Sequence, residues 1–341
     1  MKKLIALLLT MTMVLGMGAT VMAADGTTEH QDVSSITITK TYKAPNGGQS
    51  PAETFGFSAL SCESVTDAAE DVTKDNAPIP TIGEVTYAEG DATADGTGTG
   101  SKTATITLPT YTSVGIYTYK FNEAIPTTKT AGVTYNEEDL YLVVTVIEQN
   151  GKVRVAAVHC EGGTTAGTYG QPPKTDKFEN KYESGTLAIT KEVTGNLGDQ
   201  SKYFDVTVTF TAASGEAINS TITYTGGQYE QAVTVENNTA TIQVKHGDTV
   251  TFANVPEGVT YTVVEADYTG ADKYDAAAYT FSDNTKTIAA GDADTCTITN
   301  NKEQTIDTGI NMDSLPYFVI IGIVAAVAVV FFMKRRASAE E

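Results

Sequence analysis

The chain is poor in cysteine and has no tryptophan at all. Its three cysteines, Cys62, Cys160 and Cys296, cannot supply a disulfide framework for 341 residues. Either Cys62 pairs with Cys160, or the two remain buried free thiols. Whatever braces this chain is therefore something other than a set of disulfide bonds.

Positive charge and histidine are also scarce. Lysine and arginine total 22 against 42 aspartate and glutamate, which gives a net charge of −20 at pH 7. Such a surface is soluble and self-repelling, and it argues against a nucleic-acid partner. The histidines, His30, His159 and His246, have neither metal-ligand nor catalytic-triad spacing. We therefore predict no metal, no cofactor and no enzyme that turns over a substrate.

Residues 1–23 form a pattern typical of a secretory signal peptide. Lys2 and Lys3 precede an apolar run, and Val21 and Ala23 suit a signal peptidase site. We therefore expect a secreted protein from which this segment is removed.

The last segment, residues 305–341, combines a short motif at 305–309, an apolar span at 317–333 and a basic tail that begins with KRR. The uncharged run is short against the about 20 residues of a usual membrane span. The basic residues after it suit the cytoplasmic side of a membrane. We expect one transmembrane helix here, and the ordinary reading of such a helix is a single-span anchor.

The chain between these ends is long enough for two domains of ~100–200 residues each. It is rich in threonine, valine, tyrosine and glycine, and apolar and polar residues alternate in many short runs. Alternation with a period of two is typical of strands. The fold class expected from the residues is therefore all-β.

Two of these strands place a lysine on an apolar face. In ITITKTYK (36–43) and LAITKEVT (187–194), alternation puts Lys40 and Lys191 on the same side as the isoleucines. A single lysine of this kind ordinarily extends to water from the end of its strand. A lysine that stays in an apolar core needs a partner or a chemical role.

A glutamate and an asparagine follow each lysine in the same order. The tyrosine-rich runs YTYKFNEA (117–124) and YTVVEADY (261–268) put Glu123 and Glu265 on apolar faces. The closing runs, KFENKYE and CTITNNKE, do the same for Asn180 and Asn300. Each residue has an ordinary explanation alone, but a duplicated order with matching faces indicates a functional set.

The three side chains can react with one another. An apolar pocket lowers the pKa of a lysine, which makes a neutral nucleophilic amine accessible. A buried carboxyl can polarise a carboxamide and carry protons. Amine and carboxamide held in contact have a high effective molarity. The predicted outcome is an isopeptide bond with loss of ammonia, formed once per site.

The runs TLAITKEVTGN, GVTYTVVEADY and TITNNKE resemble the major (backbone) pilins of Gram-positive sortase-assembled pili, in particular the two-domain streptococcal T-antigen type. The resemblance implies two tandem Ig-like β-sandwich domains, 24–183 and 184–304. It also implies a Lys–Asn isopeptide bond in each, assisted by an acidic residue. The implied pairs are Lys40–Asn180 with catalytic Glu123 and Lys191–Asn300 with catalytic Glu265.

The same resemblance makes the C-terminal motif a sortase sorting signal. It thereby implies a transient single-pass membrane precursor, with an ordinary uncleaved anchor as the alternative. A sortase cysteine would attack the carbonyl of Thr308, release Gly309, and pass the acyl group to an amine. Ile306 and Asp307 stand where the family usually has a hydrophobic residue followed by proline. This departure leaves open which sortase reads the motif.

The accepting amine in a pilus shaft is a lysine of the next subunit. The resemblance places it a few residues before Asn180, where QPPKTDKFEN offers Lys174 and Lys177. We prefer Lys174, because it follows two prolines and should be exposed, whereas Lys177 should lie inside the last strand.

The function expected from this resemblance is that of a structural shaft subunit. Such subunits form a covalent head-to-tail polymer, anchored to cell-wall peptidoglycan as a surface pilus. The implied partners are other copies of the chain, a pilin-type sortase, minor or tip pilins and host surface ligands. The alternative is a monomeric wall-anchored adhesin built from the same domains.

Overall fold

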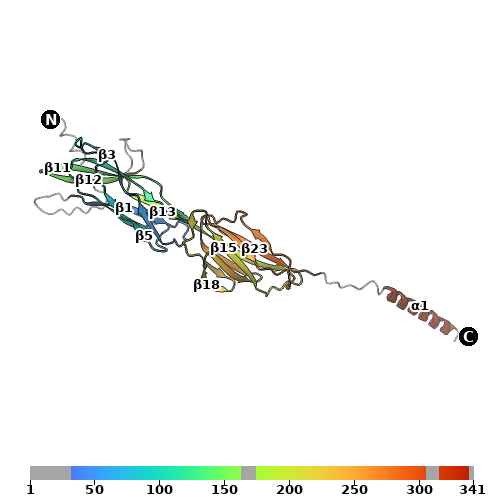
Figure 1. The fold of residues 1–341 in the computed structure, drawn as a ribbon. Helices are drawn as coiled ribbons and strands as arrows, with labels where there is room; N and C mark the ends of the chain where they lie inside the picture. The colour runs from blue at the N-terminus through green and yellow to red at the C-terminus, as the bar shows by residue number, and fades with distance from the viewer. Residues whose placement is uncertain (1–31, 163–173, 305–314, 338–341) are drawn as a thin grey trace.

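The structure is a computed structural model that describes residues 32–162, 174–304 and 315–337. Strands dominate it, and they form two β-domains that lie end to end (Figure 1). The expected signal peptide and the motif at 305–309 lie outside the described residues. The all-β, Ig-like sandwich architecture expected from the sequence is confirmed.

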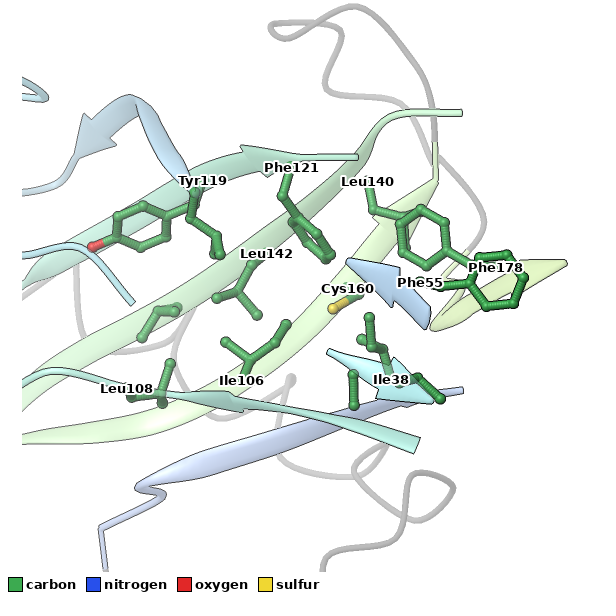
Figure 2. Packing of buried hydrophobic residues seen from close by; sticks show 14 of the residues in the cluster. Ile38, Phe55, Ile106, Leu108, Tyr119, Phe121, Leu140, Leu142, Cys160 and Phe178 are labelled. Atoms are coloured by element: carbon green, nitrogen blue, oxygen red, sulfur yellow. The ribbon is translucent and has the colours of Figure 1, made fainter. Parts of the chain in front are cut away.

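The strands of the first domain pack around one apolar core. They are β1 (Ser35–Lys43), β2 (Glu53–Phe57), β3 (Ser61–Thr66), β4 (Thr81–Ile82), β5 (Val85–Tyr87), β6 (Ser101–Thr107), β7 (Gly115–Phe121), β8 (Glu123–Ala124), β9 (Lys129–Thr130), β10 (Val133–Thr134), β11 (Leu140–Gln149), β12 (Lys152–Gly162) and β13 (Lys177–Tyr182), with a short 3₁₀ helix at Gly98–Gly100. The sheet orders are β10-β13-β1-β6-β4, β12-β11-β7-β3 and β5-β2-β8. Figure 2 shows part of this core, in which the ring centroids of Phe121 and Phe178 are 5.9 Å apart.

The second domain has a separate core between a six-stranded and a three-stranded sheet. Its strands are β14 (Ser184–Thr194), β15 (Phe204–Thr211), β16 (Glu216–Ala217), β17 (Thr223–Gly226), β18 (Tyr229–Thr234), β19 (Thr239–Val244), β20 (Thr249–Pro256), β21 (Thr260–Glu265), β22 (Ala278–Phe281) and β23 (Ala293–Asn301). The sheet orders are β18-β17-β20-β14-β23-β22 and β19-β15-β21.

In each domain the first strand and the last strand are parallel neighbours. β1 pairs with β13, and β14 pairs with β23. Side chains on every second residue of these strands point into the core, because the period of a strand is two. Both ends of each domain therefore meet in one pair of strands, and the lysine and asparagine of each set lie on that pair.

The two domains contact each other through backbone and side-chain hydrogen bonds. β9 of the first domain pairs in parallel with β16 of the second. The Asn254 amide donates to the Gln49 carbonyl at 2.9 Å, and the Tyr182 hydroxyl donates to Asn254 Oδ1 at 3.2 Å. Ala131 is fully buried in the core of the second domain. These contacts brace a connection in which only Glu183 separates β13 from β14.

The tight hairpin expected at QNGK joins β11 to β12. Gln149 faces Lys152, and Asn150 and Gly151 have φ values of 55° and 73°. Asparagine and glycine tolerate this left-handed conformation, which matches the twist of the flanking strands. The hairpin is confirmed.

The apolar run near the C-terminus forms α1 (Leu315–Ala337), which continues through the basic residues that follow the run. Within residues 32–162, 174–304 and 315–337, no helix is long and apolar enough to cross a membrane. The transmembrane span expected at 317–333 is therefore not supported. The apolar run is shorter than the about 20 residues of a usual span.

All three cysteines are free, and the pairing of Cys62 with Cys160 does not occur. Cys160 and Cys296 are fully buried. Burial raises the pKa of the Cys160 thiol to about 12 and that of Cys296 to about 11. Both behave as small apolar core residues rather than as reactive thiols.

Candidate functional site: two buried lysine, glutamate and asparagine clusters

In the first domain, three different strands supply one polar cluster to an apolar core. Lys40 comes from β1, Glu123 from β8 and Asn180 from β13. Lys40 and Asn180 are fully buried, and Glu123 is 4% exposed. Such a cluster is costly unless each polar group is paired. The strand pairing therefore holds three groups together away from water.

Each member of this cluster contacts the other two. Lys40 Nζ forms a buried ion pair with Glu123 and donates to Asn180 Oδ1 at 2.5 Å. Asn180 Nδ2 donates to Glu123 Oε1 at 2.6 Å. The carboxylate thus holds the amine with one oxygen and the amide nitrogen with the other.

Burial controls the protonation of Lys40. Removal from water lowers its pKa from 10.5 to about 8, and the neighbouring Glu123 carboxylate opposes part of that shift. A neutral amine is therefore far more accessible than on an exposed lysine. The Phe55 ring lies beside this amine, with its centroid 4.4 Å from Nζ.

The second domain repeats the arrangement with Lys191 on β14, Glu265 on β21 and Asn300 on β23. Lys191 is fully buried, Asn300 is 1% exposed and Glu265 is 8% exposed. Lys191 Nζ donates to Asn300 Oδ1 and lies 3.1 Å from Glu265 Oε1. Asn300 Nδ2 donates to Glu265 Oε2 at 2.7 Å.

The environment of Lys191 resembles that of Lys40. Burial lowers the pKa of Lys191, and the Glu265 carboxylate acts in the opposite direction. The Phe204 ring centroid lies 4.4 Å from Nζ. In addition, this amine donates to the backbone carbonyl of Ile298 at 3.3 Å.

The sequence predictions of both clusters missed two kinds of feature. Glu123 does not continue β7, as its alternation with Tyr119 and Phe121 had implied. It begins β8, which pairs with β2 of a different sheet. The aromatic partners Phe55 and Phe204 were not singled out. Both lie on the strand that follows the lysine strand, so extending the comparison of the two halves to these strands would have found them.

Geometry of this kind allows acyl transfer from the asparagine amide to the lysine amine. The nucleophile touches the carboxamide, and one carboxylate touches both the nucleophile and the leaving nitrogen. These are the contacts that proton transfer and displacement of ammonia require.

Of the two candidate linkage lysines, Lys174 lies just before β13 and Lys177 is its first residue. Lys174 is exposed and forms an isolated antiparallel bridge with Glu161 of β12. Lys177 is also exposed, is the first residue of β13 and faces Thr39 in the register. Exposure does not distinguish the two lysines, but secondary structure does, because Lys174 lies outside β13 and Lys177 lies within it. Residues 306–309 lie outside the described residues.

Comparisons with known proteins agree with this arrangement. Residues 36–183 match the family described as Spy0128-like isopeptide containing domain, and residues 185–302 match a domain of unknown function (DUF7601). A pilin of Streptococcus pyogenes serotype M1 is 29% identical over 274 residues, which cover 74% of this chain and 76% of the pilin. The chain is a homologue of the streptococcal major pilins.

Solved structures of such pilins share the fold of this pilin homologue. The crystal structure of the major pilin from Streptococcus pyogenes has a TM-score of 0.54 at 24% identity, over 80% of this chain and 99% of the other. The T3.2 major pilin from the same organism has a TM-score of 0.56 at 18% identity, with the same coverage. The pilus tip adhesin Cpa is 29% identical over 135 residues, which are 37% of this chain and 18% of the adhesin.

Proposed function

We propose that this pilin homologue is the structural shaft subunit of a covalently polymerised pilus on the cell surface. In this role each domain is braced by one internal isopeptide bond, and the subunits are joined by a sortase. In this role the subunit is a structural protein, and the chemistry that we propose for it is the formation of its own isopeptide bonds. The proposed domain limits are 24–183 and 184–304.

The observation that carries the proposal is the repetition of one polar cluster at the same place in both domains. An ordinary buried ion pair would not need an asparagine carboxamide in contact with the lysine and with the carboxylate. A second copy in the other domain, again on the first and last strands, makes a common chemical purpose the simplest explanation.

The proposed reaction conserves atoms and protons. The proton of the ammonium passes to the glutamate, and the free amine attacks Cγ of the asparagine. The glutamic acid then gives its proton to the amide nitrogen and takes one from the new C–N linkage. The bond to the old nitrogen then breaks and ammonia leaves. One proton, in place of the one that the ammonium gave up, remains on the glutamic acid. The reactants are Lys40 and Asn180 with Glu123, and Lys191 and Asn300 with Glu265.

Polymerisation follows from the proposed sorting signal. A sortase would form an acyl bond with Thr308 and lose the segment that begins at Gly309. The amine of Lys174 on the next subunit would then take the acyl group. Minor or tip pilins, host surface ligands and a final link to peptidoglycan complete the proposed set of partners.

A monomeric wall-anchored adhesin is the second candidate. The match to the pilus tip adhesin Cpa over 135 residues favours it, because that relative is named as an adhesin and not as a shaft. The two candidates differ in their products, since only a shaft subunit forms a polymer of itself.

Surface extracts from the native cell test the proposal. We expect a ladder of covalent multimers that survives boiling in detergent, and digestion should release a branched peptide that joins Thr308 to Lys174. A chain found only as a monomer, linked to the cell wall, would favour the adhesin. Mature surface protein that still contains residues 309–341 would contradict sortase processing altogether.

A further inference from the structure

A backbone N–H group points at the reacting amide of the first domain. The N–H of Asn136 donates to Asn180 Oδ1 at 3.0 Å. The position follows from the register of β10 and β13, in which Val133 faces Tyr182 and Thr134 faces Lys181. The chain that leaves β10 therefore passes directly alongside Asn180.

The local turn keeps this N–H in place. Asn136 Oδ1 accepts a hydrogen bond from the N–H of Glu138 at 2.9 Å, which is an Asx turn. The preceding Tyr135 is 7% exposed and its hydroxyl donates to Glu53 at 3.2 Å. The donor is thus fixed on both sides before any reaction begins.

We propose that the Asn136 N–H is a catalytic hydrogen-bond donor for the first isopeptide bond. The inference rests on the proposed bond formation between Lys40 and Asn180. When the amine of Lys40 adds to Cγ, the electrons of the C=O bond move to Oδ1, which becomes an oxyanion until ammonia leaves. A donor already aimed at that atom, in a site closed to water, stabilises the charge without reorganisation. The N–H keeps its own proton throughout.

The second domain provides an internal comparison. Within the described residues, Asn300 Oδ1 accepts a hydrogen bond from Lys191 alone, and no backbone N–H reaches it. The extra contact there is on the other reactant, where Lys191 Nζ donates to the Ile298 carbonyl. Removing the Asn136 N–H should therefore slow one bond and leave the other unchanged in the same molecule.

The rate of each bond can be measured during refolding. The full chain is recovered from inclusion bodies in denaturant, its mass is checked for the absence of either bond, and it is diluted into native buffer. Aliquots are quenched in acid and digested, and the two cross-linked peptides are quantified separately by mass spectrometry. Tyrosine circular dichroism follows folding in parallel.

Two variants remove the N–H by different means. Asn136→Pro deletes it genetically, and the α-hydroxy analogue of asparagine, inserted at a stop codon in the same expression host, turns the Tyr135–Asn136 amide into an ester with the side chain intact. Asn136→Ser is the matched control, because it keeps the N–H and a side chain that can form the turn. If proline prevents folding, the ester variant decides.

We expect the Lys40–Asn180 bond to form about 100- to 1,000-fold more slowly without the N–H, as for loss of one oxyanion donor. The Lys191–Asn300 bond and the Asn136→Ser variant should keep the wild-type rates. Folded proline or ester variants that form the first bond at the wild-type rate would overturn this inference and leave the proposed function intact. A wild-type chain with neither bond would remove the proposed function itself.

Discussion

Lys40 and Asn180 lie on adjacent parallel strands, two residues out of register. Lys40 faces Phe178, and Asn180 is the next residue of β13 that points to the same side. Lys191 and Asn300 have the same offset, because Lys191 faces Ile298. A diagonal neighbour on one face of a sheet lies within reach of a long side chain. The lysine therefore extends along the strand pair to the asparagine, and this one offset accounts for the lysine–asparagine contact in both clusters.

The mature protein should be lighter than its sequence mass by two molecules of ammonia. Glu123→Ala and Glu265→Ala should each restore the mass of one, because each removes the group that carries protons for its own site. Intact-mass spectrometry of purified residues 24–304 measures this directly. Glu179→Ala, an exposed carboxylate on β13, is the control and should leave both losses unchanged. A wild-type protein of full sequence mass would exclude both bonds.

Loss of the second bond should destabilise its domain by about 5 kcal/mol. The bond joins residues 109 positions apart, and a disulfide that closes a loop of about 100 residues contributes about 4.7 kcal/mol in the chain-entropy account. Asn300→Ala should therefore lower the free energy of unfolding by that amount in denaturant titrations. Asn301→Ala, on the same strand but the opposite face, should cost only about 1 kcal/mol, the loss of ordinary hydrogen bonds. Equal losses in the two variants would contradict a covalent brace.

The first bond should form more slowly as the pH rises above about 8. The pKa of Lys40 is lowered to about 8, so near neutral pH the amine still carries the proton that it can pass to Glu123. This proton is the one that must reach the leaving nitrogen. Above the pKa the pair of Lys40 and Glu123 loses it, and the rate should fall roughly tenfold per pH unit, as for any singly protonated reactant. The refolding assay at a series of pH values measures the profile.

A rate that continued to rise through pH 9 would have a different meaning. It would identify the amine deprotonated by solvent as the reactive form and would remove Glu123 from the role of proton carrier. Folding must be complete at each pH, which circular dichroism checks in the same samples.

Much of the fold and of both clusters was predictable because strands have a period of two. Alternation alone placed Lys40, Lys191, Asn180 and Asn300 on apolar faces, and the structure buries all four. The Asn150-Gly151 hairpin was predictable for a different reason, because only a few residue types adopt its backbone conformation.

Other features have no signature in a single sequence. The step of Glu123 from β7 to a different sheet depends on tertiary pairing with β2. The contact of the Asn136 N–H with Asn180 comes from a backbone group that every residue except proline carries. The pairing of β9 with β16 across the domain boundary joins segments of two residues each, which are too short to show any periodicity. The apolar run at 317–333 has the composition of a membrane span, and for that reason the sequence led to an expectation that the structure does not support.

Lys174 is expected to be the linkage residue. Both candidate lysines are exposed, but Lys174 lies outside β13, whereas Lys177 contributes to the pairing of β13 with β1. Lys174→Arg should abolish the covalent ladder in cells while leaving the mass of the monomer two ammonia short. Lys177→Arg is the matched control and should still polymerise. Loss of the ladder only in Lys177→Arg would transfer the role to that lysine.

Tension along a polymer would cross only a small part of each subunit. If it enters at Lys174, it passes along β13 and Glu183 into β14. At Lys191 it crosses the isopeptide bond to Asn300 and leaves toward Thr308. The part of the first domain that precedes Lys174 in the chain lies outside this path, and the hydrogen bonds that join β14 to its neighbours are bypassed.

The subunit should therefore not lengthen under force while its second bond is intact. Single-molecule pulling between residues 174 and 308 should show no unfolding step in the wild type. Glu265→Ala should show one step, because tension then shears β14 from β23 and breaks hydrogen bonds worth only about 0.5–1.5 kcal/mol each. The extra length should be roughly 360 Å, since 109 residues are released at ~3.3 Å each. Glu123→Ala should show no such step, because the loop that its bond closes lies almost entirely outside the path. A wild-type step of that length would mean that Lys191 and Asn300 are not covalently joined.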